Sequence, residues 1–405
     1  MRQVLSRIKS ITSQPVLQAL AVCALQFTLM MIIASVVELV HGNGKSDDYL
    51  KASYTRLVQW DSHHYIDIAD NGYHVPAAGF GGLVARDVHL RRANVAYFPA
   101  YPLIARYVGR VLGIKTEIAV LVTAQVFCAF FWIYFFLLMR IWGVDVRGRA
   151  LAACIVFMHP AAFFLICGYS ESMFMAMLLG FIFWTERWLE QAGRFRIRWL
   201  LAAAHGSLLS ITRLFGLLAA VYPFVKKRNP GSVLLAGVAA MGAVLFFVWC
   251  HYHFGSWDLY FKLQELGWGN KPEYLAIFNP MTYIPRFFLE DTVDSISRAS
   301  IPLTVILFYF ALKTDLKTHS SGIALCVVAF LMFYFPLAGK AGAKMDSMIR
   351  YTLPSFCLLV MCLARTWRYR LPKVVCTRWF AFTLLFSLVI QVWMAWRFFK
   401  GGWVA

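Results

Sequence analysis

Five side chains that can exchange protons are crowded into one short segment, LVQWDSHHYIDIADNGY, at residues 57–73. They are Asp61, His63, His64, Asp67 and Asp70. Acidic residues are scarce in the rest of the chain: the 405 residues include only 20 Asp and Glu, against 39 Lys and Arg. A carboxylate can accept a proton from an attacking hydroxyl group, and a neighbouring imidazole can orient that carboxylate. The segment is therefore the first candidate for acid–base chemistry.

The residue order in this segment predicts a short helix over residues 62–70. Asp61 is a favourable N-cap for that helix, and Gly72 is favourable just beyond its C-terminal end. Two roles for Asp61 stay open: a general base, or only a cap that stabilises the helix by about 1 kcal/mol. If Asp61 is a base at a membrane interface, partial desolvation would raise the pKa of its carboxyl group.

The helix sorts its side chains onto two faces. One face holds Asp61 and the residues that lie beside it at helical spacing: His64, Tyr65, Ile68 and Ala69. Asp67, Asp70 and His63 lie on the other side, where we expect them to meet water. The face that carries Asp61 is therefore the part to which we assign the chemistry.

Most of the remaining chain consists of apolar blocks that would position this segment. Hydrophobic residues make up 60% of the chain, charged residues only 15%, and the mean hydropathy is +0.63. Soluble proteins carry roughly a quarter charged residues, whereas these blocks suit a hydrocarbon core about 30 Å thick. The apolar spans expected, about eleven in all, lie at 16–40, 117–139, 150–168, 171–189, 199–212, 214–225, 231–254, 299–312, 321–338, 350–364 and 379–396. The sequence predicts an all-α, polytopic integral membrane protein with a single domain over residues 1–405.

The net charge of +19 is explained by membrane topology. The basic N-terminal segment, residues 1–9, belongs in the cytoplasm by the positive-inside rule. Alternation then makes the short basic loops cytoplasmic and the long connections 41–116 and 255–298 extracytoplasmic. We expect interfacial helices in the first long loop and a bacterial inner membrane, because the cytoplasmic ends carry no retention signal. Membrane lipids are expected partners, and nucleic acid is not.

No group of residues has the spacing of a metal site or a disulfide framework. None of the nine cysteines belongs to a CxxC pair, and all lie in or beside apolar spans. His63, His64, Asp67 and His74 fit no closed metal site, and nothing reads as a DxD motif for a metal–nucleotide complex. We expect no cofactor, with a divalent metal as the alternative.

Four blocks of sequence carry a resemblance to a known family. WDSHHYIDIADNGY resembles the WD-x-x-H-[FY]-x-x-IA-x-x-GY element of the PIG-V-like mannosyltransferases, which are polytopic glycosyltransferases of the GT-C class. AYFPAYPLI is similar to their FFPxFP element, HPAAFFLICGYSESMF to their NPAxxF…GYSE[SA]xF segment, and ITRLFG to an Arg-x-x-Gly element. The blocks keep the family's order across residues 57–216. Two positions depart from the pattern: His159 replaces an expected Asn, and Phe215 replaces a polar residue.

The resemblance implies a GT-C-type helical bundle and a defined reaction. A sugar, with mannose the family's choice, would pass from a polyprenyl-phosphate donor to a hydroxyl group of a glycan, lipid or protein acceptor. The transfer would occur on the extracytoplasmic face with inversion at the anomeric carbon. The expected base is an Asp in the first outer loop, which in this sequence is Asp61.

Two arginines are candidates for the donor phosphate. Arg213 lies in an apolar region, where an arginine usually faces a partner or a cavity, so a pairing with Glu171 is its alternative role. Arg350 lies beside Lys344 and Lys340 at the outer start of a span. Basic residues there suit a lipid-phosphate head group, but lysines and arginines that anchor a helix end look the same.

The remaining site candidates are one histidine and several residues suited to contact sugar. His64 matches the family's histidine and would orient Asp61 or touch the phosphate; a half-buried interfacial histidine is the alternative. Sugar or acceptor contacts are predicted for Trp60, Tyr65, Tyr97, Tyr169 and Glu171. Glu171 could also simply cap a hairpin turn. A rival function is a non-catalytic transporter of lipid-linked sugar or a scaffold subunit, which would explain the basic residues but not the WD element.

Overall fold

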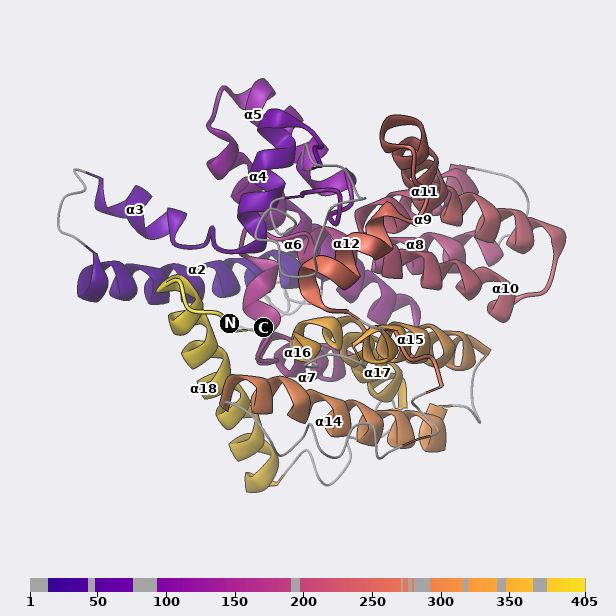
Figure 1. The fold of residues 1–405 in the computed structure, drawn as a ribbon. Coiled ribbons are helices and arrows are strands. Elements are labelled where there is room, and N and C mark those ends of the chain that lie inside the picture. The colour runs from indigo at the N-terminus through magenta and orange to yellow at the C-terminus, as the bar shows by residue number, and fades with distance from the viewer. Residues whose placement is uncertain are drawn as a thin grey trace.

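The computed structural model describes residues 14–42, 48–75, 93–190, 197–270, 272–275, 279, 292–315, 320–340, 347–366 and 377–404. Within these ranges the regular structure is helical throughout, without a strand. Six helices contain a stretch long and apolar enough to cross a membrane: α2 (Pro15–His41), α6 (Thr116–Ile141), α11 (Pro230–Phe254), α14 (Thr292–Asp315), α15 (Ser320–Gly339) and α18 (Arg378–Phe399). The predicted all-α membrane bundle is thus confirmed at this level (Figure 1).

The other helices are shorter or less apolar. Those within the bundle are α7 (Val146–Phe157), η3 (Ala162–Leu165), α8 (Glu171–Leu189), α9 (Ile197–Thr212), η4 (Leu214–Val221), α10 (Tyr222–Lys226) and α17 (Leu353–Thr366). Those at its site-bearing end are α3 (Tyr49–Thr55), α4 (Asp61–Asn71), α5 (Ala100–Leu112), α12 (Leu259–Trp268) and α16 (Met348–Tyr351).

The eleven predicted spans all coincide with helical segments, but the structure does not confirm eleven crossings. The span at 150–168 is divided, because α7 ends at Phe157 and only the single turn of η3 follows. Pro160 lies in the gap, and the residue before a proline is disfavoured in the α conformation. The span at 214–225 is likewise divided between the 3₁₀ helix η4 and the five-residue α10.

Helix α8 is the centre of the bundle. It packs against α6 and α9, and all but a few of its residues are buried. A helix that is apolar on every side is stable only when other helices or lipid surround it on every side. Because α8 is enclosed by protein, its first residue, Glu171, is fixed at the base of the site described below.

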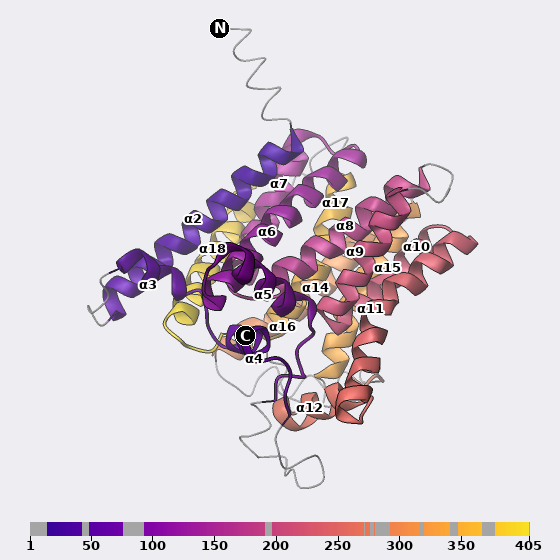
Figure 2. The same ribbon diagram turned by 90° about the horizontal axis from the view of Figure 1, so that it is seen from above.

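The segments that will form the site gather at one end of the molecule. Figure 2 shows α4, α12, α16 and the C-terminal end together, whereas the first residues of α2 and of α7 lie at the other end. The two long loops of the sequence, 41–116 and 255–298, therefore contribute to the same end of the bundle. This agrees with their assignment to one side of the membrane; the orientation itself stays a prediction, since residues 1–9 lie outside the described ranges.

Candidate active site

The catalytic candidate Asp61 begins helix α4 but does not cap it. The N-cap position is Trp60, whose φ of 49° is unusual for an aromatic residue, and it makes no side-chain cap hydrogen bond. The predicted N-cap role of Asp61 is therefore wrong. Gly72 ends the helix with a φ of 80°, as predicted. The Asp61 carboxylate is thus directed away from its own helix and toward other elements.

Both oxygens of Asp61 are held by side chains from distant segments. Arg350 Nη1 of α16 donates a hydrogen bond to Oδ2 at 2.8 Å, and the Tyr97 hydroxyl donates to Oδ1 at 3.2 Å. The backbone N–H of Asp61 donates to the Tyr169 hydroxyl at 3.3 Å. These three contacts fix the position of the carboxylate.

Arg350 belongs to a chain of four alternating charges. Arg350 Nε lies 3.2 Å from Glu171 Oε1, and Arg213 Nη1 lies 2.7 Å from the same oxygen. The side chains of Asp61, Arg350, Glu171 and Arg213 are only 4% to 18% exposed. Removing one partner from such a buried set typically costs about 3–5 kcal/mol, because the remaining charge is left uncompensated. The chain is therefore a tightly coupled electrostatic unit.

Aromatic rings surround the guanidinium group of Arg350. Its Cζ lies 5.4 Å from the ring centroids of Tyr169 and Tyr351 and 5.5 Å from that of Phe164. A cation over an aromatic face is attracted by the ring quadrupole, most strongly where water is excluded. Tyr65 supports the same wall, since its hydroxyl shares a hydrogen bond of 2.8 Å with Ser170.

The charge environment keeps Asp61 ionised, contrary to the expectation of a raised pKa. Burial disfavours the charged carboxylate, but the charge and hydrogen bond of Arg350, together with the charge of Arg213, outweigh it and lower the pKa of Asp61. Burial lowers the pKa of His64 despite the nearby carboxylate of Asp61, so its imidazole is favoured in the neutral form. In this arrangement Asp61 is a stable carboxylate rather than a strong base.

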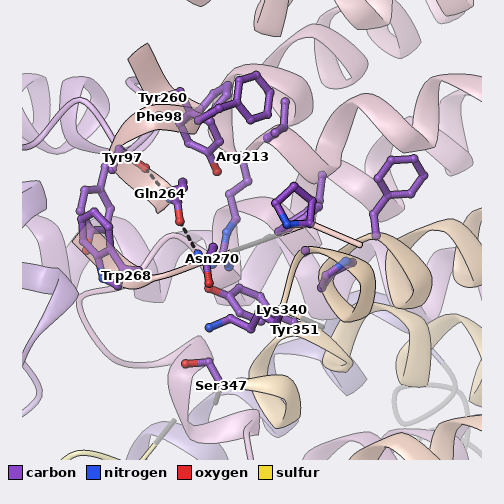
Figure 3. A pocket seen from close by; sticks show the side chains of 18 of the residues that line it. Tyr97, Phe98, Arg213, Tyr260, Gln264, Trp268, Asn270, Lys340, Ser347 and Tyr351 are labelled. Carbon is purple, nitrogen blue, oxygen red and sulfur yellow. Dashed lines mark hydrogen bonds between the residues drawn. The ribbon is translucent and has the colours of Figure 1, made fainter. Parts of the chain in front are cut away.

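A cavity of about 380 Å³ opens beside this charged unit (Figure 3). Its walls come from α4, the segment before α5, the junction of α9 with η4, α12, the end of α15, α16 and Trp403. The cavity brings carboxylate, cationic, amide and aromatic groups together around one volume, which suits a ligand with an anionic head and a polar ring.

The structure places most of the predicted site residues either on the cavity wall or directly behind it. Five of them line the cavity: Asp61, Tyr65, Tyr97, Arg213 and Arg350. Three stand behind its wall: Glu171 in the charge chain, Tyr169 under Arg350, and His64, which stacks on Tyr97 with ring centroids 4.6 Å apart. Lys344 lies outside the described residues. The individual roles assigned to these side chains stay predictions.

Trp60 occupies a different position from the cavity residues. Its Nε1–H donates to the carbonyl of Gly402 at 3.2 Å, and its ring meets Trp403 edge-on at 5.2 Å. Trp403, not Trp60, lines the cavity. The residue before Asp61 therefore clamps the segment after α18 against the site.

The expected wet face of α4 is fastened to its neighbours. Asp67 accepts hydrogen bonds from Asn71 at 2.9 Å and Asn94 at 2.8 Å, and the Thr116 hydroxyl donates to Asp70. His63 and Asp70 are exposed and Asp67 is partly exposed, so this side of the helix meets water as predicted. The two carboxylates have a further role that the prediction did not include, because they also fix α4 to the segments that follow it.

Several cavity residues were not found from the sequence. They are Gln264, Trp268, Asn270, Ser347 and Trp403, whereas Lys340, which also lines the cavity, was already named beside Arg350. The only available signal was that most lie in or beside the connections expected on the outer side. Within the described ranges no three His, Cys, Asp or Glu side chains are grouped as metal ligands would be. The absence of a metal requirement stays a prediction.

A comparison with protein families shows to which family the chain belongs. A sequence model described as mannosyltransferase (PIG-V) matches residues 7–262, which is more than half of the chain. The chain belongs to this family. The resemblance drawn from the four sequence blocks is therefore confirmed, and this family of membrane glycosyltransferases agrees with the six apolar helices. The match includes Asp61, Glu171 and Arg213, and it ends before Gln264 and Arg350.

A solved structure shares the fold. The apo oligosaccharyltransferase of Archaeoglobus fulgidus matches with a TM-score of 0.50 at 11% identity, covering 96% of this chain and 56% of that one. The same enzyme tethered to an acceptor peptide with an NVT sequon gives 0.48 at 12%, covering 95% and 55%. The archaeal oligosaccharyltransferase AglB with an inhibitory peptide and a dolichol-phosphate gives 0.45 at 12%, covering 93% and 56%. The chain thus spans about half the length of these enzymes, and curated proteins give no match.

Proposed function

We propose that this protein is an inverting mannosyltransferase that takes its sugar from a polyprenyl-phosphate donor. The acceptor is a hydroxyl group of a glycan, lipid or protein, and Asp61 is the general base. The proposal includes a bacterial inner membrane, a cytoplasmic N-terminus and a site on the extracytoplasmic side. The observation that carries it is the convergence of Asp61, Arg213 and Arg350 on one cavity in a chain that belongs to this family.

The proposed reaction is a single displacement. The acceptor oxygen attacks the anomeric carbon as its proton passes to the Asp61 carboxylate. The bond between that carbon and the phosphate oxygen breaks, and the bonding electrons leave with the polyprenyl phosphate. Arg213, with Arg350, would stabilise the charge that grows on the departing phosphate.

The charge chain suggests how a carboxylate with a lowered pKa can still act as a base. Arg350 is shared between Asp61 and Glu171. A donor phosphate in the cavity would be a further anion competing for the same guanidinium group. As Arg350 turns to the phosphate, Asp61 loses its principal counter-charge, and its pKa rises toward the value that burial favours. The base would then become effective only when the donor is bound.

Replacement of Asp61 by Asn tests the proposal most directly. An amide cannot take the proton, so transfer from polyprenyl-phosphate mannose to acceptors in native membranes should fall by about 10²–10⁴-fold. Binding of polyprenyl phosphate, measured on the same purified variant, should be retained and shows that the fold is intact. Asp145→Asn is the matched control, since Asp145 caps α7 through Gly148 and an asparagine caps equally well.

Two outcomes would contradict this assignment. Transfer at the wild-type rate by a folded Asp61→Asn variant would exclude Asp61 as the base. Alternating exposure of bound lipid on the two membrane sides, without transfer by the wild type, would favour a transporter instead.

A further inference from the structure

Helix α12 delivers a rigid group of polar and aromatic side chains to the cavity. Its inner face is anchored by Leu259 and Leu263, which are fully buried in an apolar cluster with Phe98 and Phe246. Gly269 ends the helix with a φ of 67°, a conformation that side-chain-bearing residues rarely adopt. The chain therefore turns sharply at the cavity.

The turn after Gly269 places two amide side chains together. The backbone N–H of Asn270 donates to the Gln264 carbonyl at 3.1 Å, and Asn270 Nδ2 donates to Gln264 Oε1 at 2.7 Å. Asn270 Oδ1 is buried and has no hydrogen-bond partner among the residues that the structure describes. A buried amide oxygen without a partner costs about 1–3 kcal/mol, a cost that a ligand hydroxyl group would remove once the Asn270 amide turns toward the cavity that this residue lines.

An indole ring stands next to these amides. Trp268 lines the cavity and meets Tyr97 edge-on, with ring centroids 5.9 Å apart. Tyr97 in turn donates its hydroxyl proton to Asp61. The indole is therefore one residue removed from the carboxylate.

The position of the two amides identifies what they would contact. In Figure 3 Gln264 and Asn270 lie between Tyr97 on one side and the cations Arg213 and Lys340 on the other. In a sugar phosphate bound for transfer, the phosphate meets the cations and the anomeric carbon faces the base. The sugar ring must therefore lie between them, where the amides are.

We propose that Gln264, Trp268 and Asn270 form the subsite that binds the pyranose ring of the lipid-linked donor. The inference rests on the proposed function and names the residues that select its sugar. A pyranose has an apolar face that packs on an aromatic ring and hydroxyl groups that both donate and accept hydrogen bonds. Amide side chains match them because each carries two donors and an acceptor.

The test compares two probes that differ only by the sugar. Binding of decaprenyl phosphate and of decaprenyl-phosphate mannose is measured on purified protein in nanodiscs. Asn270→Ala should weaken binding of the mannosylated lipid about tenfold, because one good hydrogen bond to a buried partner is lost. Binding of decaprenyl phosphate should stay within about twofold, because that probe has no ring for the subsite to hold.

A second pair of variants separates stacking from simple filling of space. Trp268→Phe keeps an aromatic face and should retain most of the affinity for the mannosylated lipid, whereas Trp268→Leu should lose it. Asn71→Ala is the matched control, since Asn71 is an exposed amide on α4 outside the cavity. Its affinity for both lipids should equal that of the wild type.

The outcomes decide for or against the subsite. Equal weakening of both lipids, or equal affinity of the Phe and Leu variants, would show that α12 only supports the fold. If the variants bound both lipids with unchanged affinity but had a raised KM for the acceptor, the three side chains would contact the acceptor and not the donor sugar. That result would overturn the proposal. These are binding measurements, so they remain informative if the wild type transfers no mannose, a result that would reject the proposed function alone.

Discussion

The two facing walls of the cavity are built on opposite principles. On the α4 wall, the Asp61 carboxylate is bonded at both oxygens and tied into a chain of four buried charges. On the α12 wall, Asn270 keeps a buried oxygen without a partner in the described part of the chain, and Trp268 offers a ring. A carboxylate that is bonded at both oxygens is held in place for a reaction, whereas a neutral amide oxygen without a partner is suited to meet a ligand.

The family match covers three members of the charge chain. Asp61, Glu171 and Arg213 fall within residues 7–262, whereas Arg350 and the end of α12 lie beyond them. Because the charge chain is buried and coupled, we expect substitutions in the first wall to change stability and catalysis together. Substitutions in the second wall should change ligand selection alone.

Of the substitutions that distinguish the two walls, removal of Arg350 should cause the largest loss of stability and activity. Arg350→Met leaves Asp61 and Glu171 buried without their shared cation, so the free energy of unfolding should fall by about 3–5 kcal/mol. Transfer should fall by at least about 10²-fold, as for the loss of a charge-stabilising donor. Trp268→Leu should change thermal stability far less. Similar melting temperatures for the two variants would erase the distinction between the walls.

The pH dependence of transfer should sharpen the contrast further. Arg350 opposes the effect of burial on Asp61, so Arg350→Gln should raise the pKa of this carboxyl group. Because the base must be ionised, the acidic limb of the profile of kcat/KM for the donor should move to higher pH. The profile of Asn270→Ala should keep the wild-type limb. An unchanged limb in the Arg350 variant would show that another group controls it.

The smallest effect is expected where the C-terminal segment contacts Trp60, the residue before Asp61. Trp60→Phe keeps an aromatic ring but loses the hydrogen bond to Gly402, which is worth about 0.5–1.5 kcal/mol. Transfer should fall only about two- to tenfold, with initial rates as the measurement. Trp379→Phe is the control, because Trp379 is 79% exposed at the start of α18. A loss as large as that of Asp61→Asn would mean that Trp60 touches substrate.

The helices and the first wall were largely predictable, for physical reasons. Apolar length marks a helix wherever lipid or protein surrounds it, so each of the eleven spans contains a helical segment, although two of them are divided. Hydropathy does not distinguish these two environments, and it missed the break before Pro160. Asp61, Tyr97 and Arg213 could be named as candidates because they lie in the short sequence blocks that carry the family resemblance.

The rest of the site depends on contacts that no local pattern records. The partner of Asp61 is 289 residues away, so the lowering of its pKa could not be foreseen from partial burial alone. Gln264 and Asn270 become neighbours only through the turn at Gly269. Their sequence context is that of an ordinary amphipathic segment.

The hydrogen bond between Asp61 and Arg350 has a consequence for biosynthesis. At a translation rate of 5–20 residues per second, Arg350 emerges roughly 15–60 s after Asp61. During that interval Asp61 has no arginine from α16, and Glu171 has only Arg213. The nascent chain therefore carries an incompletely neutralised acidic centre that the membrane interface must solvate until α16 arrives. Closure of this long-range contact would mark the end of assembly, so a ribosome stalled before residue 350 should yield an inactive and protease-sensitive product.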